Sequence, residues 1–204
     1  MLIQTVTALD GHVPTSRTGF NILVRTRSIN KGVVVSEITE CGWGKTVIKR
    51  IADKVREVSG FDPKKTTDFK SVVEAFGGKV SEDKDVFFGD TIKVHGKLDF
   101  TIKLHPLATT ERQRFTLAHE LGHYFLHSRQ GDKPLHAFRL GTSMAEQEAN
   151  YFAAELLMPE SMFREDFNSL SNDLDQDGKI SRMAQMYHVS FTAASVRLTS
   201  LNLL

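Results

Sequence analysis

The residues best suited to chemistry are His119, Glu120 and His123, which form the pattern His-Glu-x-x-His. On an α-helix, side chains four positions apart lie on the same face, about one turn apart. Two neutral imidazoles placed in this way can both bind one Zn²⁺, at roughly 2.0–2.1 Å each. Glu120 can then take a proton from a water molecule at the metal. The pattern predicts a metal centre with Glu120 as its general base, provided that the segment is helical.

The residues around this motif favour a helix. Thr110, followed three residues later by Gln113, predicts a capping box and a helix that begins at Thr110. No proline interrupts residues 110–130. The alternative is a buried amphipathic helix whose two histidines only form hydrogen bonds. The apolar side chains that can bury such a helix are Phe115, Leu117, Ala118, Leu121, Phe125 and Leu126.

A catalytic zinc usually has three protein ligands and one open position, so a third ligand is needed. His127 is not expected to be that ligand, because a straight helix separates it from His119 by ~12 Å along the axis. We expect His127 at the helix end. The metzincin positions hold Leu126 and Arg129 instead of glycine and histidine, which excludes that class.

The next predicted helix, within residues 146–159, offers several glutamates. At about 100° per residue, Glu146 and Asn150 lie on its apolar side, whereas Glu148 points away. A carboxylate on an apolar face needs a partner to offset its desolvation, and a metal ion is one. Glu146 is therefore the expected third ligand, with Asn150 bonding a ligand side chain. The alternative for Glu146 is an ordinary acid at a helix start. Glu148 and Glu155 are expected to be solvated.

The elements that must position these residues indicate an α+β fold, with strands first and a run of helices after them. Apolar periodicity predicts helices over residues 46–58 and 68–76. Strands are expected over residues 80–88, 91–95 and 98–104. The last strand directly precedes the metal helix. An exposed edge there would bind an extended peptide by strand addition.

The composition is that of an ordinary soluble globular protein, because 40% of the 204 residues are hydrophobic and 25% are charged. A net charge of +1 gives no overall field for nucleic acid or an anionic membrane. The single cysteine, Cys41, has no internal partner for a disulfide, which fits a reducing cytoplasm. No signal peptide or membrane-spanning run is recognised. We therefore expect a cytoplasmic protein that makes no membrane contact.

Two blocks of sequence resemble the ImmA/IrrE family of metallopeptidases. Residues 114–127 read RFTLAHELGHYFLH, and residues 146–159 read EQEANYFAAELLMP. Weaker similarity extends over about residues 45–204, and the first 40 residues have no recognised counterpart. Together the two blocks are specific, although the Glu-x-x-Ala-Asn element is of a kind shared with CaaX-type membrane peptidases.

The resemblance implies a gluzincin-like zinc endopeptidase with His119, His123 and Glu146 as metal ligands and Glu120 as base. Mn²⁺ is an alternative metal, because the same ligand set accepts it with lower affinity. The expected fold is a small antiparallel or mixed sheet with zincin-like active-site helices and a helical, helix-turn-helix-like C-terminal segment. We expect a β-rich arm over residues 1–42, a metallopeptidase core over residues 43–168 and the C-terminal segment over residues 169–204.

Members of this family typically cleave a helix-turn-helix transcriptional repressor in bacteria, phages or mobile elements, so such a repressor is the expected substrate. Three residues could supply the oxyanion donor of the reaction, His136, Arg139 and Tyr151, and the sequence does not select among them. One alternative function is a regulatory module that binds a repressor or DNA without proteolysis. The intact Glu120 argues against it, because binding alone needs no base. A proteolytic toxin paired with an antitoxin is the other alternative.

Two further patterns lie near the C-terminus. Asp173–Asp177 resembles the start of an EF-hand calcium loop, but position twelve is Ala184, so a polar turn before a helix is expected. Residues 180–198 resemble a helix-turn-helix. From residue 180 onward the only Lys, Arg, Asp or Glu residues are Arg182 and Arg197. DNA recognition generally has a denser basic footprint, so direct DNA binding is not expected.

Overall fold

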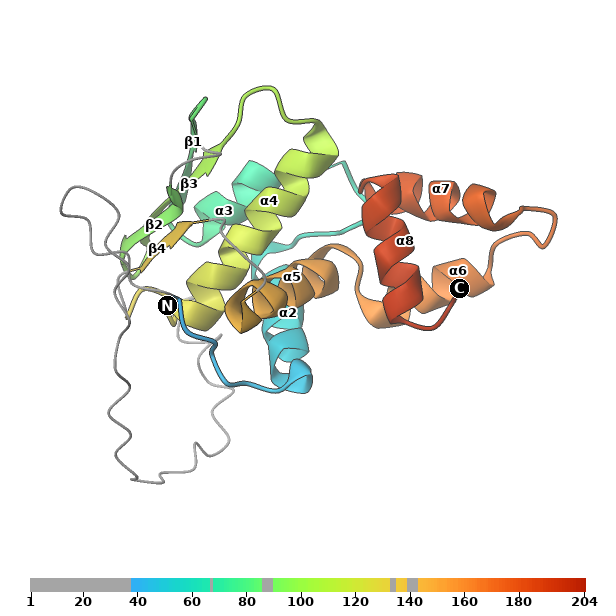
Figure 1. Ribbon diagram of the computed structural model, residues 1–204, viewed down its shortest axis with the longest axis horizontal. Coiled ribbons are helices and arrows are strands. Elements are labelled where there is room, and N and C mark those ends of the chain that lie inside the picture. The colour runs from blue at the N-terminus through green and yellow to red at the C-terminus, as the bar shows by residue number, and fades with distance from the viewer. Residues whose placement is uncertain (1–37, 67, 86–89, 133–134, 139–142) are drawn as a thin grey trace.

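The computed structural model describes residues 38–66, 68–85, 90–132, 135–138 and 143–204. The expected β-rich arm therefore lies almost wholly outside the described residues, and its structure stays a prediction. The described chain is a mixed α+β structure, as the sequence predicts, with the sheet on one side and the last three helices on the opposite side (Figure 1). None of the described helices has the length and apolar character needed to cross a membrane.

The helices that surround the site begin and end close to the predicted positions. The described elements include one short helix, α6, that the sequence did not predict. The helices are α2 (Lys45–Ser59), α3 (Phe69–Ala75), α4 (Thr110–Gly122), α5 (Met144–Leu157), α6 (Glu160–Asn168), α7 (Gln176–Tyr187) and α8 (Phe191–Ser200).

The sheet has four strands in the order β1-β3-β2-β4. The strands are β1 (Gly78–Glu82), β2 (Asp90–Gly96), β3 (Asp99–Leu104) and β4 (Leu135–Phe138). β1 runs parallel to β3, and β2 runs antiparallel to both β3 and β4. β3 is the strand that directly precedes the metal helix. The expectation that its edge is exposed is wrong, because β1 and β2 pair with its two sides. Among the described residues the edges are β1 and β4, and β4 was not predicted.

α4, which carries the His-Glu-x-x-His motif, packs against β3 on one side and α5 on the other (Figure 1). Its N-cap is Thr109, whose side-chain oxygen accepts a hydrogen bond from Arg112 N at 3.3 Å. The helix begins at Thr110 as predicted, but the capping residue is Thr109, and Gln113 Nε2 donates to Ala108 O at 3.1 Å instead of completing a capping box. Adjacent threonines can both supply such an oxygen, which explains the error.

α4 continues into a π-helical turn, η1 (His123–His127), in which Ser128 N donates to His123 O at 3.0 Å. Such turns occur frequently at functional sites. Tyr124 attaches the turn to the sheet, because its ring stacks on Phe100 of β3 at 4.1 Å between centroids. Its hydroxyl also donates to Gln130 O at 3.2 Å. The second histidine of the motif thus lies where the helix changes pitch.

Gly122 allows α4 and α5 to approach closely. A Cβ atom at this position would lie 3.1 Å from Ala149 Cα and 3.2 Å from both Ala149 O and Phe152 Cδ1. Ordinary carbon contacts are about 3.5–4.0 Å. The two helices that carry the candidate ligands therefore touch through backbone atoms at Gly122.

α8 is attached to α5 by a buried ion pair. Arg197 Nη2 lies 2.7 Å from Glu155 Oε1, and the two side chains are only 2% and 1% exposed. Arg197 Nε also donates to Met158 O at 3.0 Å. The expectation that Glu155 is solvated is wrong, because its partner comes from a helix 42 residues later.

α7 and α8 are joined by residues 188–190, which is the helix-turn-helix-like arrangement that the sequence predicts. Asp175 caps α7, since its carboxylate accepts a hydrogen bond from Gly178 N at 2.8 Å. The predicted polar turn before a helix is therefore confirmed, but it ends at Asp175, and Asp177 lies in the first turn of α7. The predicted boundaries at residues 43 and 168 stay predictions.

Candidate metal centre

The structure brings together three side chains that the sequence predicted as ligands. His119 Nε2 and His123 Nε2 lie 3.1 Å apart. Glu146 spans both, with Oε2 3.2 Å from His119 Nε2 and Oε1 3.1 Å from His123 Nε2. Within the described parts of the chain, this is the one group of three or more His, Cys, Asp or Glu residues that could hold a metal ion.

The donor set fits a zinc ion by its chemistry and its spacing. Two imidazole nitrogens and one carboxylate are ligands that catalytic zinc sites use. Tetrahedral geometry with zinc-ligand bonds near 2.0–2.1 Å places neighbouring ligand atoms roughly 3.3 Å apart. The distances between the three side chains are 3.1–3.2 Å. The three residues are therefore suited to hold a divalent metal without a large rearrangement.

Glu146 is positioned by the first turn of α5. The N-cap residue, Ser143, accepts a hydrogen bond from Glu146 N at 3.3 Å, which holds the backbone of the glutamate. Burial raises the pKa of the carboxyl group. Hydrogen bonds and charge from His119 and His123 outweigh burial and bring this pKa well below its ordinary range. Glu146 is therefore ionised at neutral pH, as a metal ligand must be.

Glu120, the predicted base, is fully buried at 0% exposure and directly follows His119 on α4. His119 and His123 are also buried, at 5% and 1%. The chemical groups thus lie in an environment from which bulk water is largely excluded. Electrostatic interactions are stronger in such an environment than at the surface.

Asn150, one turn beyond Glu146, lies beside the first histidine. Its Oδ1 is 3.0 Å from His119 Nδ1, so the predicted hydrogen bond between Asn150 and a candidate ligand is confirmed. This contact leaves Nε2 of His119 directed at Glu146. Such contacts fix the tautomer and orientation of metal-binding histidines.

His127 and Glu148 are connected to the site, although the sequence did not place them there. His127 does end η1, as predicted, but its Nδ1 lies 3.0 Å from His123 Nδ1, and its Nε2 lies 3.0 Å from Glu148 Oε2. Cys41 N also donates to Glu148 Oε2, at 2.8 Å. The expectation that Glu148 is solvated is therefore wrong, because its carboxylate has two partners from other elements.

The pKa values of His127 and Glu148 follow from their burial and from the charged groups near them. Burial and the nearby His123 lower the pKa of His127 to about 4, against the opposing effect of Glu148. Burial raises the pKa of Glu148. Its hydrogen bonds to Cys41 N and His127 outweigh burial, so the net pKa is below the ordinary value. At neutral pH His127 is therefore an uncharged ring beside a carboxylate.

None of the three candidates for the oxyanion donor is selected by the structure. Arg139 and the side chain of His136 lie outside the described residues. Tyr151 interacts with Glu155, and burial together with this glutamate raises its pKa to about 12. Tyr151 is thus directed to the ion pair between α5 and α8.

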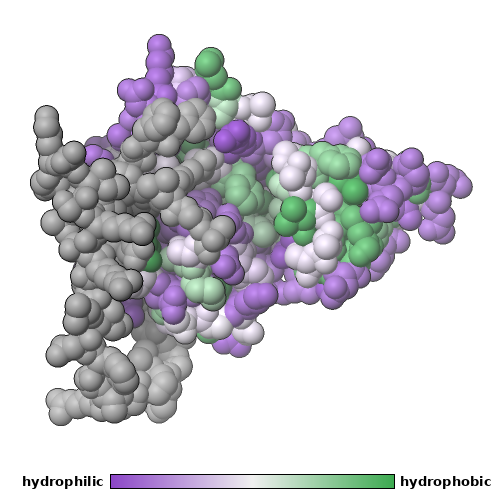
Figure 2. Space-filling view, viewed as in Figure 1, coloured by the Kyte–Doolittle hydropathy of each residue, from purple (hydrophilic) through white to green (hydrophobic). Residues whose placement is uncertain are grey.

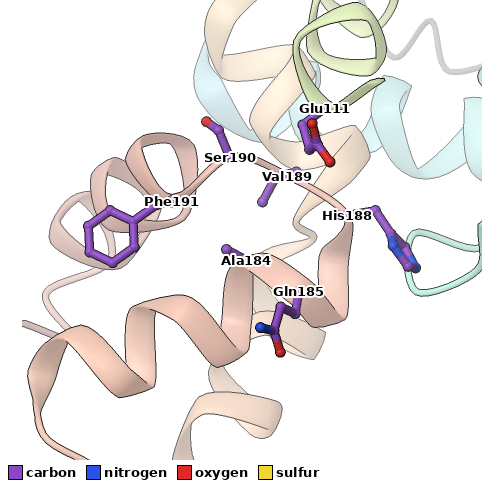
Figure 3. A pocket seen from close by; sticks show the side chains of 7 residues that line it. All are labelled: Glu111, Ala184, Gln185, His188, Val189, Ser190 and Phe191. Carbon is purple, nitrogen blue, oxygen red and sulfur yellow. The ribbon is translucent and has the colours of Figure 1, made fainter. Parts of the chain in front are cut away.

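A pocket of about 450 Å³ lies elsewhere, between the α7–α8 turn and the first turn of α4 (Figure 3). Glu111 of α4 faces this turn across the pocket (Figure 3). Apolar surface gathers over the nearby helices α7 and α8, where Phe191 is 45% and Val196 is 64% exposed (Figure 2). None of the metal-site residues lines this pocket.

Comparisons with known proteins agree with the composition of the site. The family described as the IrrE N-terminal-like domain matches residues 89–199, which contain the two histidines and the two glutamates of the site. Metallopeptidase ImmA of Bacillus subtilis (strain 168) is 35% identical over 72 residues. This match covers 35% of the present chain and 43% of ImmA, so the chain spans less than half of that relative's length. The family match covers more than half of the 204 residues, and the chain belongs to the ImmA/IrrE family of metallopeptidases.

Proposed function

We propose that the protein is a zinc-dependent endopeptidase, with His119, His123 and Glu146 as metal ligands and Glu120 as general base. The observation that carries this proposal is the convergence of two imidazole nitrogens and one carboxylate within 3.1–3.2 Å of one another. Glu120 lies directly beside this group in the sequence and is buried with it. When bound, Zn²⁺ supplies a Lewis acid and lowers the pKa of water.

The roles of the protein side chains follow from their types. Glu120 accepts the proton of the attacking water and later passes it to the leaving amine. Asn150 and His127 hold the distal nitrogens of the two histidines, so that both Nε2 atoms face Glu146. The carboxylate of Glu146 balances the charge of the site.

We infer that the substrate is a protein, and specifically a helix-turn-helix transcriptional repressor in a bacterial, phage or mobile-element switch. Family membership supports a protein substrate. The sheet supports it as well, because β4 pairs only with β2 among the described strands and packs against η1. Such an edge can receive an extended peptide by strand addition. The expected site of action is the cytoplasm, where repressors meet DNA.

Direct DNA binding by α7 and α8 is not part of this proposal. Of the two arginines in residues 180–204, Arg197 is only 3% exposed and paired with Glu155. Arg182 is thus the one exposed arginine or lysine of residues 180–204, and α7 adds only the half-buried Lys179. A helix that reads DNA needs several cations for phosphate contacts.

The test uses the purified chain and, as the candidate substrate, any helix-turn-helix repressor that is encoded beside its gene. We expect about one equivalent of zinc by elemental analysis, its loss in His123→Ala, and cleavage of the repressor at a defined bond by mass spectrometry. Glu120→Gln should retain zinc and abolish cleavage. Cleavage that survives Glu120→Gln would overturn the proposed role of Glu120.

The same experiment separates the alternative functions. A non-proteolytic regulator would bind the repressor and leave it intact even with zinc bound. A proteolytic toxin would cleave other proteins and be inhibited by the product of its neighbouring gene. Affinity for DNA that falls steeply with salt would instead identify a DNA-binding module.

A further inference from the structure

We infer that Glu148 and His127 are positioning residues that together orient His123 toward the metal. The inference rests on the proposed metal centre, but it concerns residues outside the ligand set. A continuous line of contacts runs from Glu148 Oε2 to His127 Nε2 at 3.0 Å, and from His127 Nδ1 to His123 Nδ1 at 3.0 Å. The opposite nitrogen of His123, Nε2, is the one that faces Glu146 at 3.1 Å.

With a metal bound at His123 Nε2, the direction of every hydrogen bond in this line follows from its two ends. Glu148, as a carboxylate, can only accept, so His127 carries its proton on Nε2 and donates it to Glu148 Oε2. His127 Nδ1 is then an acceptor and receives the proton of His123 Nδ1. His123 Nε2 is left without a proton, which is the form that binds a metal. The carboxylate thus sets the tautomers of two successive rings.

The surroundings hold this line in place. The side chains of His123 and His127 are each 1% exposed, and that of Glu148 is 11% exposed. Water therefore has little access to compete for the hydrogen bonds. The π-helical turn His123–His127 contains both histidines, and Ser128 N closes it onto His123 O. A local change of helical pitch thus accompanies the alignment of the two rings.

The two ligand histidines are supported differently. His119 Nδ1 lies 3.0 Å from the neutral amide oxygen of Asn150, whereas His123 is connected through a second ring to a negative charge. A carboxylate raises the basicity of a metal-binding imidazole through such a contact. We therefore expect the hydrogen-bonded line behind His123 to strengthen metal binding more than the Asn150 contact behind His119 does.

Glu148 has a second hydrogen-bond partner, and any test must distinguish the effect of that contact from the effect of the contact with His127. Cys41 N donates to the same oxygen, Oε2, at 2.8 Å. Glu148→Ala therefore also releases the segment before α2. Glu148→Gln keeps one oxygen that can accept both hydrogen bonds, and it removes only the charge.

The experiment measures the zinc dissociation constant of each variant by competition with a chromophoric chelator. Removal of a partner of a ligating histidine typically weakens metal binding by about 10–100-fold. We expect a loss in this range for Glu148→Ala and for His127→Phe, and a smaller loss for Glu148→Gln. Glu165→Gln, which removes a charge from an exposed site on α6, is the matched control and should stay within about twofold of wild type.

A double-mutant cycle tests whether Glu148 acts through His127. In the His127→Phe background, Glu148→Gln, which keeps an acceptor for Cys41 N, should cause no further loss of zinc affinity, because the line is already broken. Additive losses would overturn the inference, since Glu148 would then act by another route, such as the Cys41 contact. Circular dichroism and thermal unfolding of the metal-free variants verify that each one folds.

The tautomers give a readout that does not depend on activity. In ¹⁵N-histidine-labelled protein loaded with zinc, we expect protons on Nδ1 of His123 and Nε2 of His127. A proton on Nδ1 of His127 would overturn the inference. If His123→Ala loses zinc while Glu148→Ala and His127→Phe bind it like wild type, only this inference fails. A wild-type chain that binds no zinc would contradict the proposed function itself.

Discussion

Gly122→Ala should weaken metal binding even though alanine is the better helix former. The added Cβ would lie 3.1 Å from Ala149 Cα and 3.2 Å from Phe152 Cδ1. Normal carbon contacts are about 3.5–4.0 Å, so α4 and α5 must separate by several tenths of an ångström. Backbone atoms of Ala149 cannot rotate away as a flexible side chain could.

This separation acts directly on the candidate ligands. His119 and His123 lie on α4 and η1, whereas Glu146 lies on α5. Metal sites hold their distances within about 0.2 Å, which is less than the expected displacement. Alanine gains about 1 kcal/mol of helix propensity over glycine, and overpacking costs about 1–3 kcal/mol. We therefore expect a loss of stability of no more than about 2 kcal/mol and a zinc affinity at least about tenfold weaker.

The assay is chelator competition for zinc, together with urea unfolding of the metal-free protein. Gly44→Ala is the matched control, because no heavy atom lies within 4 Å of its added Cβ. This control should bind zinc like wild type. If Gly122→Ala binds zinc as tightly as Gly44→Ala does, the contact between α4 and α5 does not set the distance from Glu146 to the histidines, and the reasoning is refuted.

Three further predictions concern stability and reactivity. Glu155→Gln leaves the buried Arg197 without its counter-charge and should lower the free energy of unfolding by about 3–5 kcal/mol in urea titrations. Glu160→Gln, in two partly exposed pairs with Lys49 and Arg164, should lower it by less than about 1 kcal/mol. Equal losses of stability in the two variants would contradict this prediction. Burial, aided by Glu148, raises the pKa of the Cys41 thiol to about 12. Ellman's reagent at pH 8 should therefore react with Cys41 at least ~100-fold more slowly in the folded protein than in the unfolded protein. Similar rates in the two states would refute the raised pKa. Zinc at 1,000 times its dissociation constant should add about 4.1 kcal/mol of stability, so an unfolding midpoint that chelators leave unchanged would argue against a metal centre.

The sequence predicts the convergence of the three candidate ligands, and the part of this prediction that concerns the two histidines is local. His119 and His123 are one helical turn apart, and the apolar face of α5 identifies Glu146. The helical period fails for Glu148 and Glu155, because it divides α5 into one buried and one solvated side. In the structure α5 packs against α4, η1 and α2, so few of its positions face solvent.

The partners that the sequence did not reveal come from distant parts of the chain. Glu148 meets residues 21 and 107 positions away, and Glu155 meets one 42 positions away. The interior position of β3 was missed for a similar reason, because its parallel neighbour β1 pairs directly with it although β2 lies between the two strands in the sequence. Periodicity indicates which residues are apolar, but it does not identify which strands or charges will pair.

The ion pair between α5 and α8 has a consequence for synthesis on the ribosome. Glu155 is made 42 residues before Arg197. Until α8 emerges, α5 carries a carboxylate bound for the interior without the cation that neutralises it there. α5 also carries Glu146, so the helix that completes the candidate ligand cluster gains its full set of contacts only after α8 has been made. We expect the nascent protein to acquire its metal late, after translation has passed α8.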